Sequence, residues 1–282
     1  MKRIALVNDL SGFGRCSLTA AIPVVSVMGM QACPLPTAVL TAQTGFEDYF
    51  CDDYTDRMDF FTRKWKQMDV SFDGIYSGYL EGAQQIEKVL HFLDTFQEET
   101  TIYLADPVMG DQGKPYTMHS AALVKGMRQL MLRADVITPN LTELCMLAEI
   151  AYEDMMRHSA EENYISRVKQ VCRMLLETSS RTKYIVVTGI IRKKGEREYI
   201  GNLAVSRSES HYIENIYTGK GFSGTGDLFA SVIIGSLVKG LSIRKAMEKA
   251  TYFLQEAIEE ASEEDIPAVH GIHFENYLSR LL

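Results

Sequence analysis

The sequence has few cysteines, and no two of them stand at the C-x-x-C spacing. Five cysteines occur among 282 residues, which is an odd number. A disulfide framework needs paired cysteines, and structural zinc sites usually need closely spaced ones, so neither is predicted. We therefore expect reduced thiols and a cytoplasmic location.

Basic residues and long apolar runs are also scarce. Lysine and arginine number 29 against 37 acidic residues, for a net charge of -8, and they form no basic stripe. The electrostatic term that drives nucleic-acid binding therefore has no obvious source, so no nucleic-acid partner is expected. No apolar run reaches the ~20 residues of a membrane helix, and the first one stops at Asn8-Asp9, too early for a signal peptide. We expect no membrane partner.

Short β-rich runs alternate with longer segments of helical period. The expected strands are 3–8, 73–77, 101–105 and 135–138, followed in turn by expected helices at 12–28, 81–96, 119–132 and 141–148. This alternation predicts βαβ units and a parallel sheet.

The last third of the chain has a different pattern. Expected strands at 184–188, 198–205 and 212–217 are separated only by turns, which predicts an antiparallel extension of the sheet. Two helices follow at 224–239 and 242–261, the second with Ser242 as its N-cap. No linker, repeat or low-complexity tract interrupts this order, so one domain is predicted over residues 1–282.

The strongest local motif is Gly224-Thr225-Gly226-Asp227, directly before an apolar helix. Glycines let the backbone approach a ligand closely, and a helix N-terminus offers free N–H groups to an anion. A carboxylate there would repel phosphate, but it suits a site where a hydroxyl loses its proton beside a phosphate. Asp227 is therefore predicted to be a general base, with the N–H groups as an anion hole. The alternative is that Asp227 only complements the helix dipole.

Two further motifs each follow an expected strand. Asp106-Pro107-Val108-Met109-Gly110-Asp111 lies where open α/β sheets bind ligands, and its two carboxylates could organise Mg²⁺. The alternative is an ordinary Asp-Pro turn. In Thr138-Pro139-Asn140-Leu141-Thr142-Glu143, Asn140 can cap a helix with Glu143 at the capping-box position. Capping and contact with a metal-bound phosphate are compatible, and we expect both.

The three motifs, in this order and rough spacing, resemble those of the ribokinase-like superfamily over nearly the whole chain. Within it, the segments N-D-L-S-G-F-G (8–14), T-A-Q-T-G-F (41–46) and S-G-Y (77–79) are most similar to the vitamin B6 kinases. The resemblance implies a three-layer α/β/α ribokinase-like fold, with a mostly parallel central sheet and an antiparallel C-terminal extension. It also implies a homodimer.

The same resemblance implies the reaction and the residues that perform it. Asp227 would deprotonate the 5′-hydroxymethyl group of pyridoxal, pyridoxamine or pyridoxine, and the amides of Gly224, Thr225 and Gly226 would stabilise charge on the γ-phosphoryl group. The residues implied to line the substrate pocket, with Asp227, are Asp9, Thr44 and Tyr79.

The residues implied to bind ATP are Asp111, Asn140, Thr188, Gly189, Thr225, Gly226 and Tyr116. The residues implied to serve Mg²⁺ are Asp106, Asp111 and Glu143. The segment 112–116 resembles the lid by which B6 kinases cover ATP, and closing it would exclude water. A need for a monovalent cation such as K⁺ is left open.

The sequence leaves the substrate open in several respects. Hydroxymethylpyrimidine kinases usually carry D-P-S-G-G-A-G at the first motif and often cysteine at the position of Asp227, so both departures favour the B6 side. B6 kinases often have serine and histidine where this chain has Asp9 and Gln43, which leaves the preferred vitamer open. A sugar kinase of the same superfamily and a metabolite sensor without catalytic activity are also compatible with the motifs.

Overall fold

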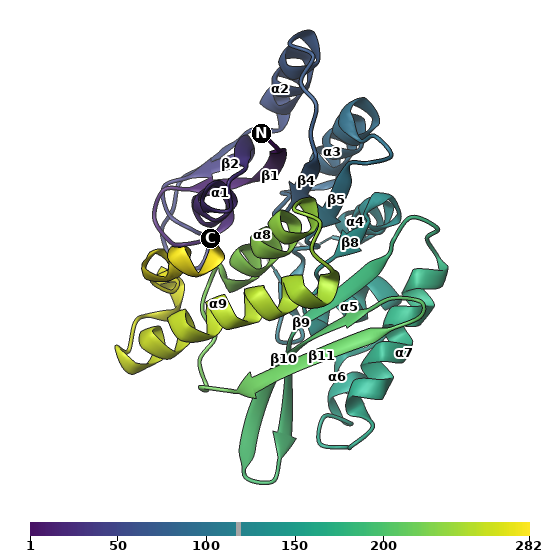
Figure 1. Cartoon of the computed structure of the whole chain (residues 1–282), viewed down its shortest axis with the longest axis vertical. Helices are drawn as coiled ribbons and strands as arrows, with labels where there is room; N and C mark the ends of the chain where they lie inside the picture. The colour runs from purple at the N-terminus through teal and green to yellow at the C-terminus, as the bar shows by residue number, and fades with distance from the viewer. Residues whose placement is uncertain (117–119) are drawn as a thin grey trace. The chain divides into compact units, whose positions relative to one another are not determined.

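The structure is a computed structural model that describes residues 1–116 and 120–282. The chain forms two compact units: unit 1 comprises Met1–Leu104 and Gly219–Leu282, and unit 2 comprises Ala105–Thr218. Both ends of the chain thus belong to unit 1 (Figure 1). The single domain expected over residues 1–282 stays a prediction.

Unit 1 contains a mostly parallel sheet with the strand order β5-β4-β1-β2-β3. Its strands are β1 (Arg3–Ser11), β2 (Gln31–Leu40), β3 (Cys51–Asp53), β4 (Gly74–Ser77) and β5 (Ile102–Ala105). The first strand pairs in parallel with β2 on one side and β4 on the other, while β3 runs antiparallel to β2. The expected parallel sheet is therefore confirmed here.

The helices of unit 1 pack against this sheet and against one another. They are α1 (Ser17–Val27), α2 (Thr55–Gln67), α3 (Ala83–Phe96), α8 (Thr225–Val238) and α9 (Ile243–Glu263), with short 3-10 helices at Ala268–His270 and Phe274–Leu281. In Figure 1, α8 and α9 run side by side, and α8 also packs on α1 and β4. A Cβ atom on Gly74 would lie 2.8 Å from Val238 Cγ2, so this glycine lets α8 approach β4 closely.

Strand β2 and helix α2 were not expected from the sequence. Two prolines, Pro34 and Pro36, argue against a central strand because proline cannot donate to a ladder. They are tolerated because β3 pairs only with the end of β2, from Ala38 to Leu40. Before that point β2 pairs with β1 alone, so the ladder does not require an N–H donor at both Pro34 and Pro36.

Unit 2 contains strands in the order β11-β10-β9-β8. They are β8 (Val136–Ile137), β9 (Tyr184–Lys194), β10 (Arg197–Val205) and β11 (Ser210–Ile216), beside a separate hairpin of β6 (Gly110–Asp111) and β7 (Lys114–Pro115). The pairing of β8 with β9 is parallel, whereas β9, β10 and β11 are antiparallel. The predicted antiparallel extension is confirmed.

The helices of unit 2 are α4 (Ala121–Arg133), α5 (Leu141–Ala148), α6 (Tyr152–Met156) and α7 (Tyr164–Glu177). The expected helix start at His119 lies outside the described residues. In α5, Asn140 Oδ1 accepts a hydrogen bond from Glu143 N and Glu143 accepts one from Asn140 N, so the predicted capping box is present. Ser242 likewise caps α9 as predicted.

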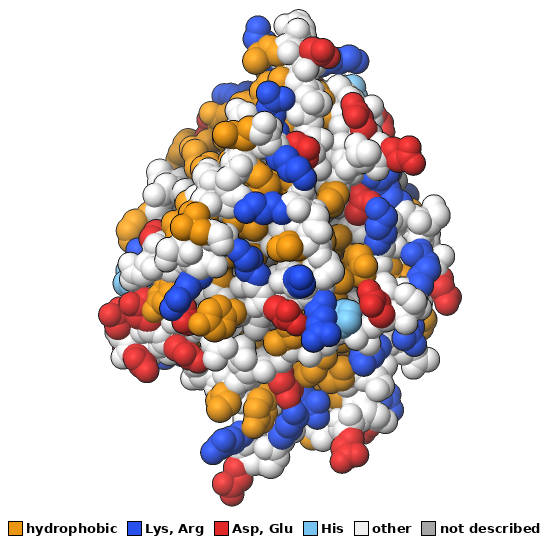
Figure 2. Space-filling view, viewed as in Figure 1, with side chains coloured by type: hydrophobic (Ala, Val, Ile, Leu, Met, Phe, Trp, Pro, Cys, Tyr) orange, Lys and Arg blue, Asp and Glu red, His pale blue; other side chains and the backbone are white. Residues whose placement is uncertain are grey.

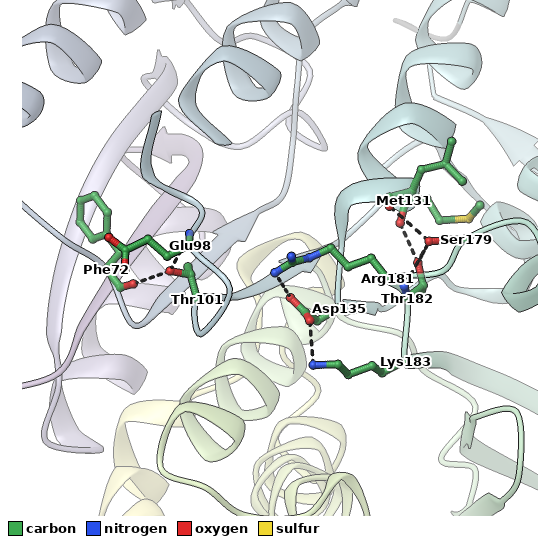
Figure 3. Close-up of polar contacts among 10 residues, drawn as sticks. Phe72, Glu98, Thr101, Met131, Asp135, Ser179, Arg181, Thr182 and Lys183 are labelled. Atoms are coloured by element: carbon green, nitrogen blue, oxygen red, sulfur yellow. Dashed lines mark hydrogen bonds and ion pairs between the residues drawn. The ribbon is translucent and has the colours of Figure 1, made fainter. Parts of the chain in front are cut away.

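Polar contacts fix the amino ends of the strands in each unit (Figure 3). In unit 2, buried Asp135 forms ion pairs of 3.1 Å with both Arg181 and Lys183, which ties the start of β8 to the start of β9. In unit 1, Thr101 Oγ1 donates to Phe72 O at 2.9 Å, next to the starts of β5 and β4. The loops that carry the sequence motifs lie at the opposite, carboxyl ends.

Over the ranges that the structure describes, no helix is both long and apolar enough to cross a membrane. On the face drawn in Figure 2, basic and acidic side chains are interspersed, without a broad basic patch.

Candidate active site

The turn before α8 requires glycine at its first position. Gly224 has φ 80°, and a Cβ atom there would lie 1.9 Å from Arg15 O. Thr225 Oγ1 donates to Phe222 O at 3.0 Å, which closes the turn. Gly226 is exposed and has open space around it. The backbone N–H groups of this turn thus stand at the start of α8, as the sequence predicts for an anion site.

Asp227 lies in the first turn of α8, and its carboxylate accepts three hydrogen bonds within unit 1. Oδ1 accepts from Asn8 Nδ2 at 2.9 Å and from Tyr76 Oη at 3.1 Å. Oδ2 accepts from Ser17 N at 2.8 Å, so it also caps the start of α1. Burial raises the pKa of Asp227 above its ordinary 3.8, while the three donors oppose that rise. The group is half-buried, oriented and suited to accept a proton.

Two predicted substrate residues, Asp9 and Tyr79, are joined to Asp227 through one side chain. Asn8 Oδ1 accepts from Asp9 N at 3.0 Å and from Tyr79 N at 2.8 Å, while its amide nitrogen faces Asp227. Thr44, the third predicted pocket residue, is exposed, and none of the hydrogen bonds of the described residues joins it to this network.

The carboxyl group of Asp9 is buried and accepts from Ser11 Oγ at 2.8 Å. Burial raises its pKa from 3.8 to about 6; the Asp227 carboxylate adds to this, and the hydroxyls of Ser17 and Ser11 oppose it. Burial also raises the pKa of Tyr79, helped by Glu81 and Asp9, so its phenol stays neutral. A neutral aromatic ring beside a buried carboxylate can hold a heteroaromatic ring that carries an N–H donor.

Gln43, which stands where B6 kinases often have histidine, joins segments of the backbone. Its Nε2 donates to Val269 O at 2.9 Å and to Ser223 Oγ at 3.3 Å, and its Oε1 accepts from Gly45 N at 2.8 Å. It thereby fastens the segment after β2 to the residue just before Gly224.

The predicted metal and nucleotide residues of unit 2 form a second network. Glu143 accepts from Asn140 N at 2.8 Å and from Met109 N at 3.0 Å, and Asn140 Nδ2 donates to Gly110 O at 2.8 Å. Asp106 Oδ1 accepts from Thr138 Oγ1 at 2.9 Å. The structure therefore brings the D-P-V-M-G-D and T-P-N-x-x-E motifs together at the start of α5.

The predicted lid segment is the β6–β7 hairpin. Gly113 N donates to Thr142 Oγ1 at 2.9 Å, which anchors the hairpin to α5, and Tyr116 N donates to Met109 O at 2.9 Å. Asp111 Oδ1 accepts from Gln112 N at 2.8 Å, and burial raises the pKa of Asp111. The side chain of Tyr116 is largely exposed.

Thr188 and Gly189 lie inside β9, which continues to Lys194 rather than ending at residue 188 as expected. The register of β9 with β10 shifts at this point, and Gly189 has φ 66°. Thr188 N donates to Pro139 O at 2.9 Å, beside the Asn140 cap. The sequence missed the continuation because the bulge interrupts the alternating pattern.

Three carboxylates of unit 2 create local negative charge that a cation would offset. Burial, followed by the Asp106 carboxylate, raises the pKa of Glu143 well above its ordinary range, with a smaller contribution from Asp111. Among the residues that the structure describes, no three His, Cys, Asp or Glu side chains are close enough to ligate a metal directly. The set fits Mg²⁺ that keeps most of its water ligands and completes its shell with phosphate oxygens.

Sequence reasoning missed Asn8, Tyr76 and Ser17 as parts of the site. Asn8 carried a signal, since it directly precedes Asp9 at the end of the first strand. Tyr76 and Ser17 carried none, because their contacts with Asp227 depend on which strand lies beside β1 and where α1 begins.

Comparisons with known proteins identify the family of this chain and proteins similar to it. Residues 16–271 match the phosphomethylpyrimidine kinase family. A solved structure of a candidate phosphomethylpyrimidine kinase from Bacteroides thetaiotaomicron is 37% identical, with a TM-score of 0.91 over 99% of this chain and 93% of that one. A second crystal form described as holding pyridoxal has 37% identity and a TM-score of 0.89, covering 99% of this chain and 95% of that one.

The chain therefore belongs to the phosphomethylpyrimidine kinase family. A pyridoxal kinase from Lactobacillus plantarum, 24% identical, shares the fold with a TM-score of 0.87 over 100% of this chain and 97% of that one, which agrees with the predicted fold. The pyridoxal kinase PdxY of Histophilus somni is 28% identical over 191 residues, which are 66% of this chain and 63% of that protein. The match thus spans less than two thirds of that relative's length.

Proposed function

We propose that this chain transfers the γ-phosphoryl group of ATP to the 5′-hydroxymethyl group of pyridoxal, pyridoxamine or pyridoxine. The observation that carries the proposal is the Asp227 carboxylate, oriented by three donors at the N-terminus of α8 and linked through Asn8 to Asp9 and Tyr79. The relative described with pyridoxal, which is 37% identical over nearly the whole chain, supports the substrate class.

The chemistry follows from the surroundings of Asp227. A hydroxymethyl group is a poor nucleophile until a base removes its proton, and a carboxylate with a raised pKa is a stronger base than one in water. The N–H groups of Gly224, Thr225 and Gly226 would stabilise the negative charge of the transferring group. Asp9 and Tyr79 would hold the pyridine ring so that its hydroxymethyl group faces the base.

The residues of unit 2 are proposed to serve the nucleotide. Asp106, Asp111 and Glu143 would hold hydrated Mg²⁺, which supplies charge neutralisation for the phosphates. Asn140, Thr188 and Gly189 would contact ATP, and the anchored hairpin with Tyr116 would limit the access of water.

A second candidate is phosphorylation of a hydroxymethylpyrimidine. The family match favours it, and the buried Asp9 carboxylate could accept from an amino group on a pyrimidine as readily as from a ring N–H. The two substrates need the same base and nucleotide site, so only the acceptor separates them.

The test is ADP release from Mg-ATP with the three unphosphorylated B6 vitamers, hydroxymethylpyrimidine and ribose as parallel acceptors. Turnover with a vitamer is expected. Turnover with the pyrimidine or ribose alone would keep the kinase mechanism and contradict the assigned substrate. If no acceptor gave turnover but ligand binding were measurable, the result would favour a metabolite sensor without catalytic activity.

Asp227→Asn is the variant that tests the base. We expect kcat to fall by about 10²- to 10⁴-fold with little change in the KM for ATP. Asp73→Asn is the matched control, because exposed Asp73 accepts from Arg3 N at the amino ends of β4 and β1. Equal losses in both variants would contradict the role of Asp227.

Three further properties are part of the proposal. The resemblance to B6 kinases supports a homodimer, which light scattering on the purified protein would test. The five free cysteines support a cytoplasmic location. A requirement for K⁺ would appear as a loss of activity when KCl is replaced by an equal concentration of a large organic cation.

A further inference from the structure

The two oxygens of the Asp227 carboxylate have different surroundings. Oδ1 accepts two hydrogen bonds, from Asn8 Nδ2 and Tyr76 Oη, whereas Oδ2 accepts one, from Ser17 N, among the described residues. A carboxylate oxygen has about two lone-pair positions for hydrogen bonds. Oδ1 is therefore saturated by the protein, and Oδ2 keeps one position for a ligand.

The orientation of the Asn8 amide is fixed by the backbone around it. Two backbone N–H groups, from Asp9 and Tyr79, donate to its oxygen, so its nitrogen has to face Asp227. Asn8 is fully buried, and a Cβ atom on Gly78 would lie 2.5 Å from its Nδ2. A reversed amide would point its NH₂ group at these two backbone N–H donors, so the hydrogen-bond pattern fixes the donor that Asn8 offers to Oδ1.

Tyr76 reaches Oδ1 because of its place in the sheet. It lies on β4, which pairs in parallel with β1, and side chains alternate between the two faces of a strand. Gly74 and Tyr76 share the face that α8 covers, so the Tyr76 ring is fully buried and its hydroxyl is directed at the start of α8. A rigid strand therefore holds the second donor in place.

We propose that Asn8 and Tyr76 are positioning residues that clamp Oδ1, so that Oδ2 is the oxygen that takes the substrate proton. This inference rests on the proposed function. In the transfer, the substrate O–H bond breaks and an Oδ2–H bond forms, while the electron pair stays on the substrate oxygen. That oxygen bonds to the γ-phosphorus as the bond to the β–γ bridging oxygen breaks, and ADP leaves with that pair.

The clamp also sets the pH range in which Asp227 can act. Among the residues that the structure describes, the titratable groups that face Asp227 besides Tyr76 are Asp9 and Cys16. The pKa of Cys16 is raised to about 12, mainly by burial and next by the charges of Asp227 and Asp9, so the thiol stays neutral. Asp9 titrates near pH 6 and has to be followed separately.

Tyr76→Phe tests the clamp because it removes a single oxygen. Tyr103→Phe is the matched control: Tyr103 is also fully buried in unit 1, but its hydroxyl lies 2.7 Å from Ser77 Oγ rather than at the base. A hydrogen bond to a charged group is worth enough to move a pKa by about one pH unit. Losing it should raise the pKa of Asp227, because the donor stabilises the ionised form.

The first readout is the ¹³C NMR titration of aspartate carboxyl carbons, with Asp227→Asn and Asp9→Asn identifying the two signals. We expect the pKa of Asp227 to rise by about one pH unit in Tyr76→Phe and to stay unchanged in Tyr103→Phe. Equal values in the wild type and Tyr76→Phe would overturn the clamp. This readout needs no turnover, so it stands even when every acceptor in the activity test fails.

The second readout is the pH profile of kcat with pyridoxal. In Tyr76→Phe the acidic limb should move up by about one pH unit, with about a tenfold loss at acidic pH that recovers at alkaline pH. The KM for ATP should not change. A loss of the same size at every pH would indicate a merely structural role and overturn the proposal.

The choice of oxygen is tested by a crystal structure of the wild type with pyridoxal. We expect the 5′-hydroxyl oxygen within hydrogen-bond distance of Asp227 Oδ2. A contact with Oδ1 instead would overturn the assignment. Asn8→Ala provides an independent variant with the same expected shift of the Asp227 signal, provided that its melting curve shows a folded protein.

Discussion

Replacing Asp9 by asparagine should make the protein more stable at neutral pH but not at acidic pH. The Asp9 carboxyl group is buried at the end of β1, and burial is the largest cause of the rise of its pKa from 3.8 to about 6. At about 1.4 kcal/mol per pH unit, this elevation corresponds to about 3 kcal/mol. The folded state is destabilised by this amount at every pH at which Asp9 is ionised in both the folded and the unfolded chain.

The sign of the effect follows from linkage. Above pH 6 the group is charged in both folded and unfolded chains, and the cost of burying the charge is fully present. Well below the unfolded-state pKa of 3.8 the group is protonated in both states and the cost disappears. Asparagine keeps an oxygen that can accept from Ser11 Oγ but carries no charge, so the gain in Asp9→Asn should grow as the pH rises from 4 to 7.

The assay is thermal unfolding at a series of pH values. For folding units of this size, 1 kcal/mol moves Tm by about 2 to 4 °C, so the gain at neutral pH is at most about 6 to 12 °C. Asp48→Asn is the matched control at an exposed position of unit 1. Parallel curves for Asp9→Asn and the wild type, with a constant difference from pH 4 to pH 8, would refute the reasoning.

Three further outcomes can be measured with the same protein. Gly224→Ala should prevent stable folding, since its Cβ would lie 1.9 Å from Arg15 O at a left-handed φ. Gly226→Ala lies in open space and should melt at or above the wild-type temperature, but it should turn over more slowly. Similar melting curves for the two variants would contradict the steric argument. Gly110→Ala would place a Cβ atom 2.4 Å from Lys114 O and distort the β6–β7 hairpin, so the KM for ATP should rise by several-fold while the KM for the acceptor stays unchanged. An unchanged KM for ATP would show that the hairpin does not contribute to nucleotide binding. Chelation of Mg²⁺ should abolish ADP release, and added Mg²⁺ should restore it; activity in excess chelator would refute the assignment of the acidic residues of unit 2 to a metal.

The sequence predicted the elements whose signals are local. The capping box of Asn140 and Glu143 is present, and α8 begins within one residue of its expected start. Both depend on residues three or four positions apart, whose backbone groups interact within a single turn. The alternation of strands and helices likewise indicated a parallel sheet because the crossover helix is encoded next to each strand.

Strand β2 shows where local reasoning fails. Its two prolines violate the usual pattern of a strand, and only the pairing scheme explains why they are accepted: β3 pairs only with Ala38 to Leu40, beyond both of them. The same holds for β9, whose continuation past Gly189 depends on a bulge opposite β10. Pairing partners lie far away in the chain, so no window of sequence contains the information.

By itself, the sequence determined the α/β class, and it indicated the ribokinase-like resemblance and Asp227 as the candidate base, since the motif that ends in Asp227 needs only neighbouring glycines and a helix start. Tertiary structure alone decided how that base is held. Asn8, Ser17 and Tyr76 are 219, 210 and 151 positions away from Asp227 in the chain, and they meet it because β1, α1 and β4 pack around the start of α8. Hydrogen bonds act over about 3 Å in space, whatever the separation in sequence, so the surroundings of the carboxylate exist only in the folded chain.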